Sequence, residues 1–356
     1  MARILIKNGR VWNGEKFFHA DVLTDGEIVA RVKADISEPV DFVYDAKGKI
    51  VSAGFVDTHV HLKGVASDRF GIQAEMSSFP FGVTAVNDAG SGSKGSKERL
   101  EGFAVKSTAF VGTEICDNHF LPAVTEDLLE RYGDKAIGIK IYFDPKVCEV
   151  RDITPLREAC DYARASGLAV MVHTANSPVP MTEVVSTLGR GDILTHSYHG
   201  GGHTCAEDDF ASLRLARERG VWIDAGFAGH VHTDFKIFAD AVAAGYAPDC
   251  ISTDITRYSA YMRGGRYGMT MCMSMARHLG MCEEEILRAV TSTPAKALGK
   301  AEKWGTLRKG GVADIAVIAL AKDGFSLADA AGNHIESKDG YRCVLTVSDG
   351  QIVYKD

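Results

Sequence analysis

The sequence lacks the features that would assign it to several specialised classes of protein. It has no basic excess, since 40 Lys and Arg stand against 47 Asp and Glu, which argues against nucleic acid as the main partner. It has no apolar stretch of about 18 residues, which excludes a membrane-spanning helix, and no long apolar run at its start that would indicate a secretory signal. Its eight cysteines include no Cys-x-x-Cys pair, so we expect reduced thiols and a cytoplasmic location.

What the sequence does contain is an alternation of strand-like and helix-like segments. Eight short β-prone runs begin near residues 55, 84, 108, 137, 169, 193, 221 and 251. Several intervals between them carry helical patterns, such as TPLREACDYARAS and FKIFADAVAAG. Eight consecutive β-then-α units predict an α/β protein with a (β/α)8 TIM barrel over residues 54–304. An open doubly wound sheet is disfavoured, because no G-x-G-x-x-G motif follows the first run.

The two ends of the chain share a different pattern. Asp25-Gly26 and Asp349-Gly350 each lie between two apolar-rich runs, and Asp-Gly favours tight β-hairpins. The chain of 356 residues also exceeds the roughly 250 residues of a simple barrel. We therefore expect a small β-sandwich domain built from residues 1–53 and 305–356.

Polar residues near the ends of the predicted barrel strands are the candidates for chemistry, because active sites of such barrels lie at the C-terminal ends of the strands. The candidates are His59, His61, Lys140, His173, His196 and Asp254. His59 and His61 are two residues apart, so an extended strand directs both imidazoles to one side, where they can bind one metal ion. With twelve histidines, chance alone supplies roughly 0.4 such pairs. A second pair, His230 and His232, follows the seventh run, and we interpret it as surface or substrate-loop histidines.

Lys140 is the unusual member of this set. An ammonium at an inward-facing strand position beside metal ions is disfavoured by desolvation and by like charge. The neutral amine can add CO₂ to give a carbamate, an anionic ligand able to bridge two cations. The alternative is a structural lysine held by a salt bridge.

Taken together, these residues resemble the amidohydrolase superfamily, in particular its two-metal dihydroorotase-like and hydantoinase-like members. The likeness runs the whole length, through LIKNGRVWNGE, GKIVSAGFVDTHVH, GIKIYF, VMVHT, ILTHSYHG, ISTD, TSTPAKALG and KGGVADIAVI. GIKIYFDP, VMVHT and GDILTHSYHG are most similar to a deacetylase-like branch of that superfamily.

The resemblance implies a role for each candidate. His59 and His61 are expected to bind a first divalent metal, His173 and His196 a second, and carboxylated Lys140 to bridge the two. Asp254 is expected to contact the first metal and to shuttle protons during attack by a bridging hydroxide. Zinc suits these ligands, although manganese, iron and cobalt remain open. Relatives also suggest a homo-oligomer.

The substrate is expected to be a small molecule held by loops after the strands. The candidates for contacting it are Lys63, Arg257, Tyr142, Asn176 and His199. Dihydroorotases carry Arg where this chain has Lys63, and lysine lacks the planar fork that binds a carboxylate through two hydrogen bonds.

The main hypothesis is therefore a deacetylase-like amidohydrolase that hydrolyses an amide or ester bond of a small N-acyl or O-acyl acid. The alternative is a cyclic amidohydrolase that opens a dihydroorotate-, hydantoin- or lactone-like ring. A deaminase and a metal-free scaffold are two further hypotheses. The deaminase is disfavoured because Lys140 completes a two-metal set, and the scaffold because all six ligands are present.

Overall fold

The computed structural model describes residues 2–62, 70–90, 100, 102–229, 231–262, 266–322 and 324–356. Two residues discussed above, Lys63 and His230, lie outside these described residues. Among the described helices, none has the length and apolar character needed to cross a bilayer.

Seven parallel strands form most of the barrel wall. They are β6 (Phe55–Val60), β7 (Val83–Ala89), β8 (Lys106–Gly112), β11 (Ala136–Tyr142), β12 (Ala169–His173), β13 (Ile193–Thr195) and β14 (Trp222–Ile223), paired in that order. Residues 250–255 occupy the eighth position without forming a regular strand. Cys250 bridges to Asp224 beyond β14, and Ile255 bridges to Val60 of β6. The predicted TIM barrel is thus present, although its eighth member is held by isolated bridges.

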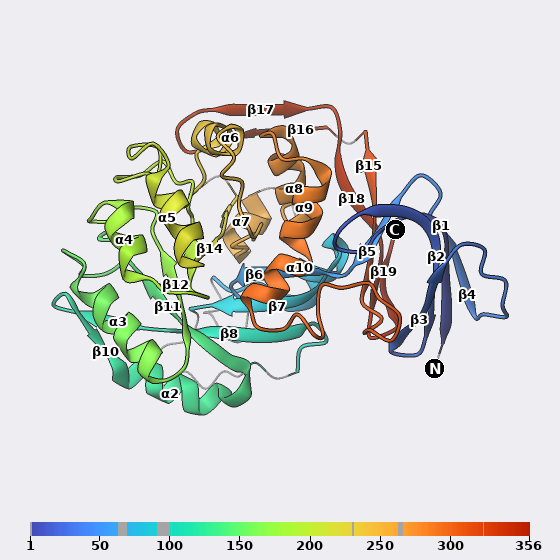
Figure 1. The fold of residues 1–356 in the computed structure, drawn as a ribbon, viewed down its shortest axis with the longest axis horizontal. Coiled ribbons are helices and arrows are strands. Elements are labelled where there is room, and N and C mark those ends of the chain that lie inside the picture. Colours follow the sequence, from blue (N-terminus) through green and yellow to red (C-terminus); the bar gives the residue numbers. More distant parts are fainter. Residues whose placement is uncertain are drawn as a thin grey trace.

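Helices alternate with these strands and cover the outside of the barrel (Figure 1). They are α1 (Ala74–Ser78), α2 (Pro122–Tyr132), α3 (Thr154–Ala165), α4 (Met181–Thr187), α5 (Ala211–Arg219), α6 (Phe235–Ala243), α7 (Arg257–Met262), α8 (Met269–His278), α9 (Glu283–Val290) and α10 (Ser292–Ala297), with 3₁₀ turns η1 (Phe79–Phe81) and η2 (Gly133–Lys135) and a small ribbon of β9 (Glu114–Cys116) and β10 (His119–Leu121). In α3, Pro155 lies in the first turn, where no amide donor is needed, and Leu156, Ala159, Cys160 and Ala163 are buried on one face.

Both ends of the chain enter one eight-stranded sheet beside the barrel (Figure 1). Its strands are β1 (Arg3–Trp12), β2 (Phe17–Asp25), β3 (Ile28–Lys33), β4 (Phe42–Asp45), β5 (Ile50–Ala53), β15 (Ile315–Ala321), β18 (Gly340–Ser348) and β19 (Gln351–Lys355). The order is β19-β18-β15-β5-β1-β2-β3, with β4 paired to β1. The expectation that the termini share a sheet is confirmed, whereas the sandwich stays a prediction.

The two Asp-Gly turns differ in detail. At the β18–β19 hairpin, Asp349 and Gly350 both have positive φ (47° and 72°), as a type I′ turn requires. At the β2–β3 hairpin Asp25 ends the strand, and of this pair only Gly26 has positive φ (57°). The two turns lie against each other, since a Cβ on Gly350 would stand 1.8 Å from the carbonyl oxygen of Gly26.

A further hairpin, β16 (Phe325–Ala328) and β17 (His334–Ser337), runs from this sheet over the barrel to α6 (Figure 1). Its tip is fixed by Asp329, whose carboxylate accepts the backbone N–H of Phe235 at 2.8 Å. Asn333 donates to the carboxylate of Asp329 at 2.7 Å and lies 3.4 Å from that of Asp234. The C-terminal part of the chain thereby contributes to the mouth of the barrel.

Candidate metal centre

All six side chains predicted to bind metal are buried together near the C-terminal ends of the barrel strands. They are His59, His61, Lys140, His173, His196 and Asp254, and each is less than a tenth exposed. Polar groups at these positions face the end of the barrel where α/β-barrel enzymes carry their active sites. The contacts between these side chains determine their protonation states and which donor atoms can bind a metal ion.

Asp254 lies against both histidines of the first pair. Its Oδ1 is 3.3 Å from His59 Nε2 and 2.9 Å from His61 Nε2. Its backbone N–H donates to the carbonyl of His59 at 2.8 Å, which joins the last barrel segment to the first strand. The φ of Asp254 is 46°, a left-handed conformation that costs about 1 kcal/mol and is characteristic of functional sites. Burial alone would raise the pKa of Asp254, but the imidazoles of His59 and His61 hold it below its ordinary value, so the group is a carboxylate.

Lys140 is fully buried beside the same pair. Its Nζ lies 3.1 Å from His59 Nε2 and 3.5 Å from the sulfur of Met171. Among the described residues, no carboxylate forms an ion pair with it, which does not support the structural alternative of a salt-bridged lysine. Burial lowers the pKa of Lys140 to about 7, although nearby carboxylates oppose the shift. A large fraction of the amine is therefore neutral near pH 7.

Hydrogen bonds orient His59 and His196 so that one ring nitrogen of each stays available. The Thr195 hydroxyl donates to Asp224 at 2.6 Å, so Thr195 Oγ1 accepts from His59 Nδ1 at 3.1 Å. His196 Nδ1 donates to the carbonyl of Gly226 at 2.7 Å. Both bonds assign the proton to Nδ1 and leave the lone pair on Nε2. Burial lowers the pKa of both rings well below the ordinary value, so both are neutral.

His173 and His196 form the second part of the centre. Their ring centroids are 4.4 Å apart. Within the described part of the chain, the buried Nε2 atoms of both rings have no hydrogen-bond partner, and His173 Nε2 lies 3.5 Å from a carboxylate oxygen of Asp144. Buried polar atoms left without a partner are costly, and a bound cation would satisfy them.

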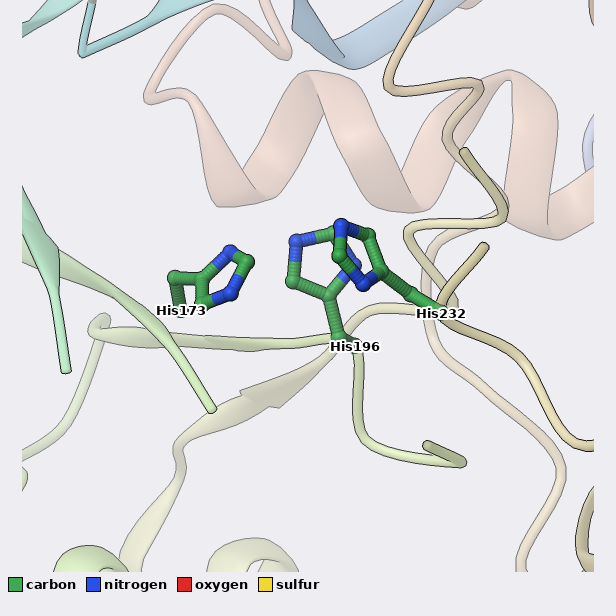
Figure 2. A group of neighbouring side chains, drawn as sticks. All are labelled: His173, His196 and His232. Carbon is green, nitrogen blue, oxygen red and sulfur yellow. The ribbon is translucent and has the colours of Figure 1, made fainter. Parts of the chain in front are cut away.

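Of the two interpretations given for His232, surface or substrate-loop histidine, the structure contradicts the surface position. Figure 2 shows its ring beside those of His173 and His196, with centroid distances of 5.0 and 4.3 Å. Its Nε2 is 3.8 Å from Asp254 Oδ2, and its side chain is 21% exposed. The loop after β14 folds back over the barrel because Thr233 bridges to the loop after β13. In the sequence, the one indication of this role was a pair of histidines just after a barrel strand. The spacing of the pair does not reveal that the loop after β14 folds back over the barrel.

The donor set fits a centre for two divalent cations. Two groups of three residues each bring their donor atoms within 4.8 Å of one another, and His196 belongs to both groups. One group adds His59 and Asp254, and the other adds His173 and His232. Neutral imidazoles with carboxylates are ligands that zinc and neighbouring transition metals prefer. A carbamate on Lys140 would add an anionic ligand next to His59.

The substrate candidates fall into two groups. Tyr142, Asn176 and His199 lie close to the centre. The Tyr142 ring is 5.5 Å from that of His173, Asn176 donates to Asp144 at 2.8 Å, and His199 is 1% exposed with a buried Nε2 that lacks a partner in the described residues.

Arg257 is the remaining substrate candidate within the described part of the chain, which does not include Lys63. Arg257 begins α7 and lies over the ring of Tyr261 at 5.7 Å. It lines a cavity of about 300 Å³ with Ile72 and Tyr261. A separate cavity of about 400 Å³ opens at His232. The structure therefore does not place Arg257 in the cavity that reaches His232.

A comparison with protein families decides which family this chain belongs to. The sequence model of the amidohydrolase family matches residues 50–353. The chain belongs to the amidohydrolase family. Two deacetylases are similar to this chain, each 28% identical: one from Agrobacterium fabrum over 88% of this chain and 81% of its own length, and one from Enterococcus faecalis over 98% of both. A solved dihydroorotase structure superposes with a TM-score of 0.86 at 22% identity, covering 100% of this chain and 98% of that one.

These findings confirm the resemblance drawn from the motifs. This amidohydrolase is a hydrolase acting on carbon–nitrogen bonds. The likeness to the dihydroorotase establishes the barrel fold, and the choice among amidohydrolase substrates depends on the site itself.

Proposed function

We propose that this amidohydrolase is deacetylase-like and hydrolyses an amide or ester bond of a small N-acyl or O-acyl acid. One observation carries the proposal: successive contacts of 2.9–3.3 Å join the donor atoms of Lys140, His59, Asp254 and His61 at a buried strand end. Beside them, the buried Nε2 atoms of His173 and His196 have no hydrogen-bond partner among the described residues. Two deacetylase relatives that align with most of this chain support this choice of bond.

The proposed roles follow from the contacts. Divalent cations held by the histidines and Asp254 would polarise the acyl carbonyl and lower the pKa of water to near neutrality. Asp254 accepts the proton of the attacking water and returns it to the leaving nitrogen or oxygen. One water is consumed, the acyl C–N or C–O bond breaks, and the products are a carboxylic acid and an amine or alcohol. Tyr142, Asn176 and His199 are proposed to contact the substrate, as are Arg257 and Lys63.

The cofactor assignment is also a proposal. Two zinc ions fit the imidazole-rich set, with manganese, iron and cobalt as alternatives. On Lys140, the neutral amine adds CO₂ and loses one proton, giving a carbamate. The burial of Lys140 beside His59 without an ion-pair partner in the described residues supports this step.

The domain division, the cellular location and the oligomeric state are also proposed, each on its own grounds. Residues 1–53 and 305–356 form a sandwich-like terminal domain, and residues 54–304 form the barrel. An apolar cluster within the terminal sheet that includes Ile6, Val22 and Leu345 supports this division, as does the bridge from Ile28 to Val312 at the sheet edge. A cytoplasmic location agrees with eight free cysteines, and a homo-oligomer agrees with the family resemblance.

The experiment that tests the function is a substrate screen on metal-loaded protein. The pool contains N-acetyl amino acids, O-acetyl hydroxy acids and cyclic ureides, and mass spectrometry follows the products. A substrate that splits into acetate and a smaller partner supports the proposal. A substrate that only gains the mass of water supports ring opening, the alternative that the likeness to a dihydroorotase favours. The Asp254→Asn variant gives the background.

A further inference from the structure

The cavity of about 400 Å³ that opens at His232 has walls from five parts of the chain. They are the loops after β11 (146), β12 (175–176), β13 (200–201) and β14 (231–234), and the tip of the β16–β17 hairpin (330–331). His232 forms the end nearest the centre, because its ring lies against two of the metal-binding histidines. A substrate whose acyl group reaches the centre would place its remaining part in this cavity.

Lys146 brings a positive charge to this cavity. Among the described residues that line it, Lys146 is the one lysine or arginine. Its Nζ donates to Asn176 Oδ1 at 2.8 Å, and no carboxylate of the described residues forms an ion pair with it. The charge is therefore available to an anionic ligand.

The two nearby carboxylates are already engaged. Asp144 accepts the backbone N–H of Lys146 and the side-chain amide of Asn176, each at 2.8 Å. Asp234, which also lines the cavity, caps α6 by accepting the N–H of Ile237 at 3.0 Å. Neither carboxylate forms an ion pair with the ammonium of Lys146.

A chain of contacts fixes Lys146 relative to the metal centre. Lys146 bonds to Asn176 at 2.8 Å, Asn176 bonds to Asp144 at 2.8 Å, and Asp144 lies 3.5 Å from His173 Nε2. The ammonium thus stands three side-chain contacts from a residue that would bind metal.

The walls limit how large that substrate can be. Gly201 packs so closely on the neighbouring loop that a Cβ would stand 2.0 Å from the carbonyl oxygen of Ala175. On the outer side, Ala330 and Ala331 are held over the cavity by the bond from Phe235 to Asp329. A volume of about 400 Å³ is near the lower end for ligand pockets, which indicates a small molecule.

Resting on the proposed function, we infer that Lys146 is the specificity-determining residue that binds the free carboxylate of the substrate. The substrate class is then an N-acyl amino acid or O-acyl hydroxy acid with a free carboxylate and a short side chain. The carboxylate contact is thereby assigned to Lys146, whereas Arg257, a candidate for contacting the substrate, lines the other cavity.

The test compares N-acetyl amino acids with their uncharged carboxamides on metal-loaded protein. Lys146→Gln should raise KM for the acids roughly tenfold or more, because a charge-assisted contact is lost, and should leave KM for the carboxamides unchanged. Lys146→Arg should retain most of the preference for acids. Lys309→Gln, which removes an exposed lysine at a turn outside the cavity, should behave as the parent protein. Equal losses for acids and carboxamides, or no loss, would overturn the inference.

A binding measurement separates this inference from the proposed function. Calorimetry with Asp254→Asn uses the same N-acetyl amino acids and carboxamides without turnover. If this protein prefers the acids and the preference disappears with Lys146→Gln, the assignment of Lys146 stands even where no acetate is released, and the deacetylase proposal alone fails. If it shows no preference for acids, the Lys146 assignment is wrong whatever the screen yields.

Discussion

The Nζ of Lys140 lies 3.1 Å from Nε2 of His59, deep in the barrel and without a carboxylate partner among the described residues. An amine and an imidazole that share so little space both favour their neutral forms, since each desolvates the other. Both groups are then ready to act as ligands, the imidazole directly and the amine after it has taken up CO₂.

Lys140→Ala should reduce the metal content of the purified protein below two ions per chain. The variant loses the anionic carbamate, and Asp254 would be the one anionic group left among the six predicted ligands to balance two dications. Short carboxylic acids such as propionate should partly restore both metal content and turnover. Mass spectrometry of the metals checks this, with Lys135→Ala as a control outside the six predicted ligands. Full metal occupancy and full activity in Lys140→Ala would exclude the carbamate.

Metal reloading of the stripped protein should depend on pH through Lys140. Because the neutral amine adds CO₂, and burial lowers the pKa of Lys140 to about 7, reloading should slow as pH falls below that value and level off above it. One unit below, the neutral fraction is about a tenth, so the rate should drop about tenfold. His59 and His196 do not add to this dependence, since their pKa values lie well below the ordinary value. The measurement keeps dissolved CO₂ constant, and a flat profile contradicts the prediction.

Asp254→Asn should keep its metal and lose most of its turnover. The amide oxygen can still face His59 and His61, but the side chain can no longer accept a proton. General acid–base groups contribute about 10²- to 10⁴-fold, so kcat should fall within that range. Metal analysis and steady-state kinetics on the same preparation check it. Loss of metal together with activity would show a ligand role alone.

The barrel and the gathering of six polar side chains at one end of it could be predicted because both depend on local pattern. Each β-then-α unit carries its own apolar periodicity, and the C-terminal ends of parallel strands meet at one end of a closed barrel. His59, His173 and Asp254 therefore come together whatever the loops do. The regular eighth strand does not form: residues 250–255 are held by isolated bridges, and the backbone at Asp254 is left-handed.

The loops could not be predicted in the same way. His232 enters the site only because Thr233 bridges to His199, a contact between loops after different strands. Lys146 is an exposed lysine in no motif, and its significance comes from Asn176 and from a hairpin more than 150 residues later in the chain. Such long-range contacts leave no periodic signal in the sequence.

His232→Asn should lower kcat/KM about 10- to 100-fold while both metals remain bound. In the proposed centre His173, His196 and Lys140 would supply ligands for the second cation, so His232 is expected to act on the substrate side, where its ring borders the cavity. Binding-site contacts of this kind appear in kcat/KM. His203→Asn is the matched control, because that side chain is 43% exposed and lies beside Glu207. Loss of one metal ion per chain would instead make His232 a ligand.

Gly201→Ala should destabilise the protein and disturb the cavity, whereas Gly202→Ala should do neither. The added Cβ at position 201 would meet the carbonyl oxygen of Ala175 at 2.0 Å and the side chain of Asn176 at 2.9 Å, so a loop must move. Overpacking of this kind costs about 1–3 kcal/mol in free energy of unfolding. At the next residue, nothing lies within 4 Å of the position a Cβ would take.

Because Asn176 positions Lys146, Gly201→Ala should also raise KM for N-acetyl amino acids more than for their carboxamides. Denaturant unfolding and kinetics on the two variants check both effects, and equal stability of the pair contradicts the close packing of this wall.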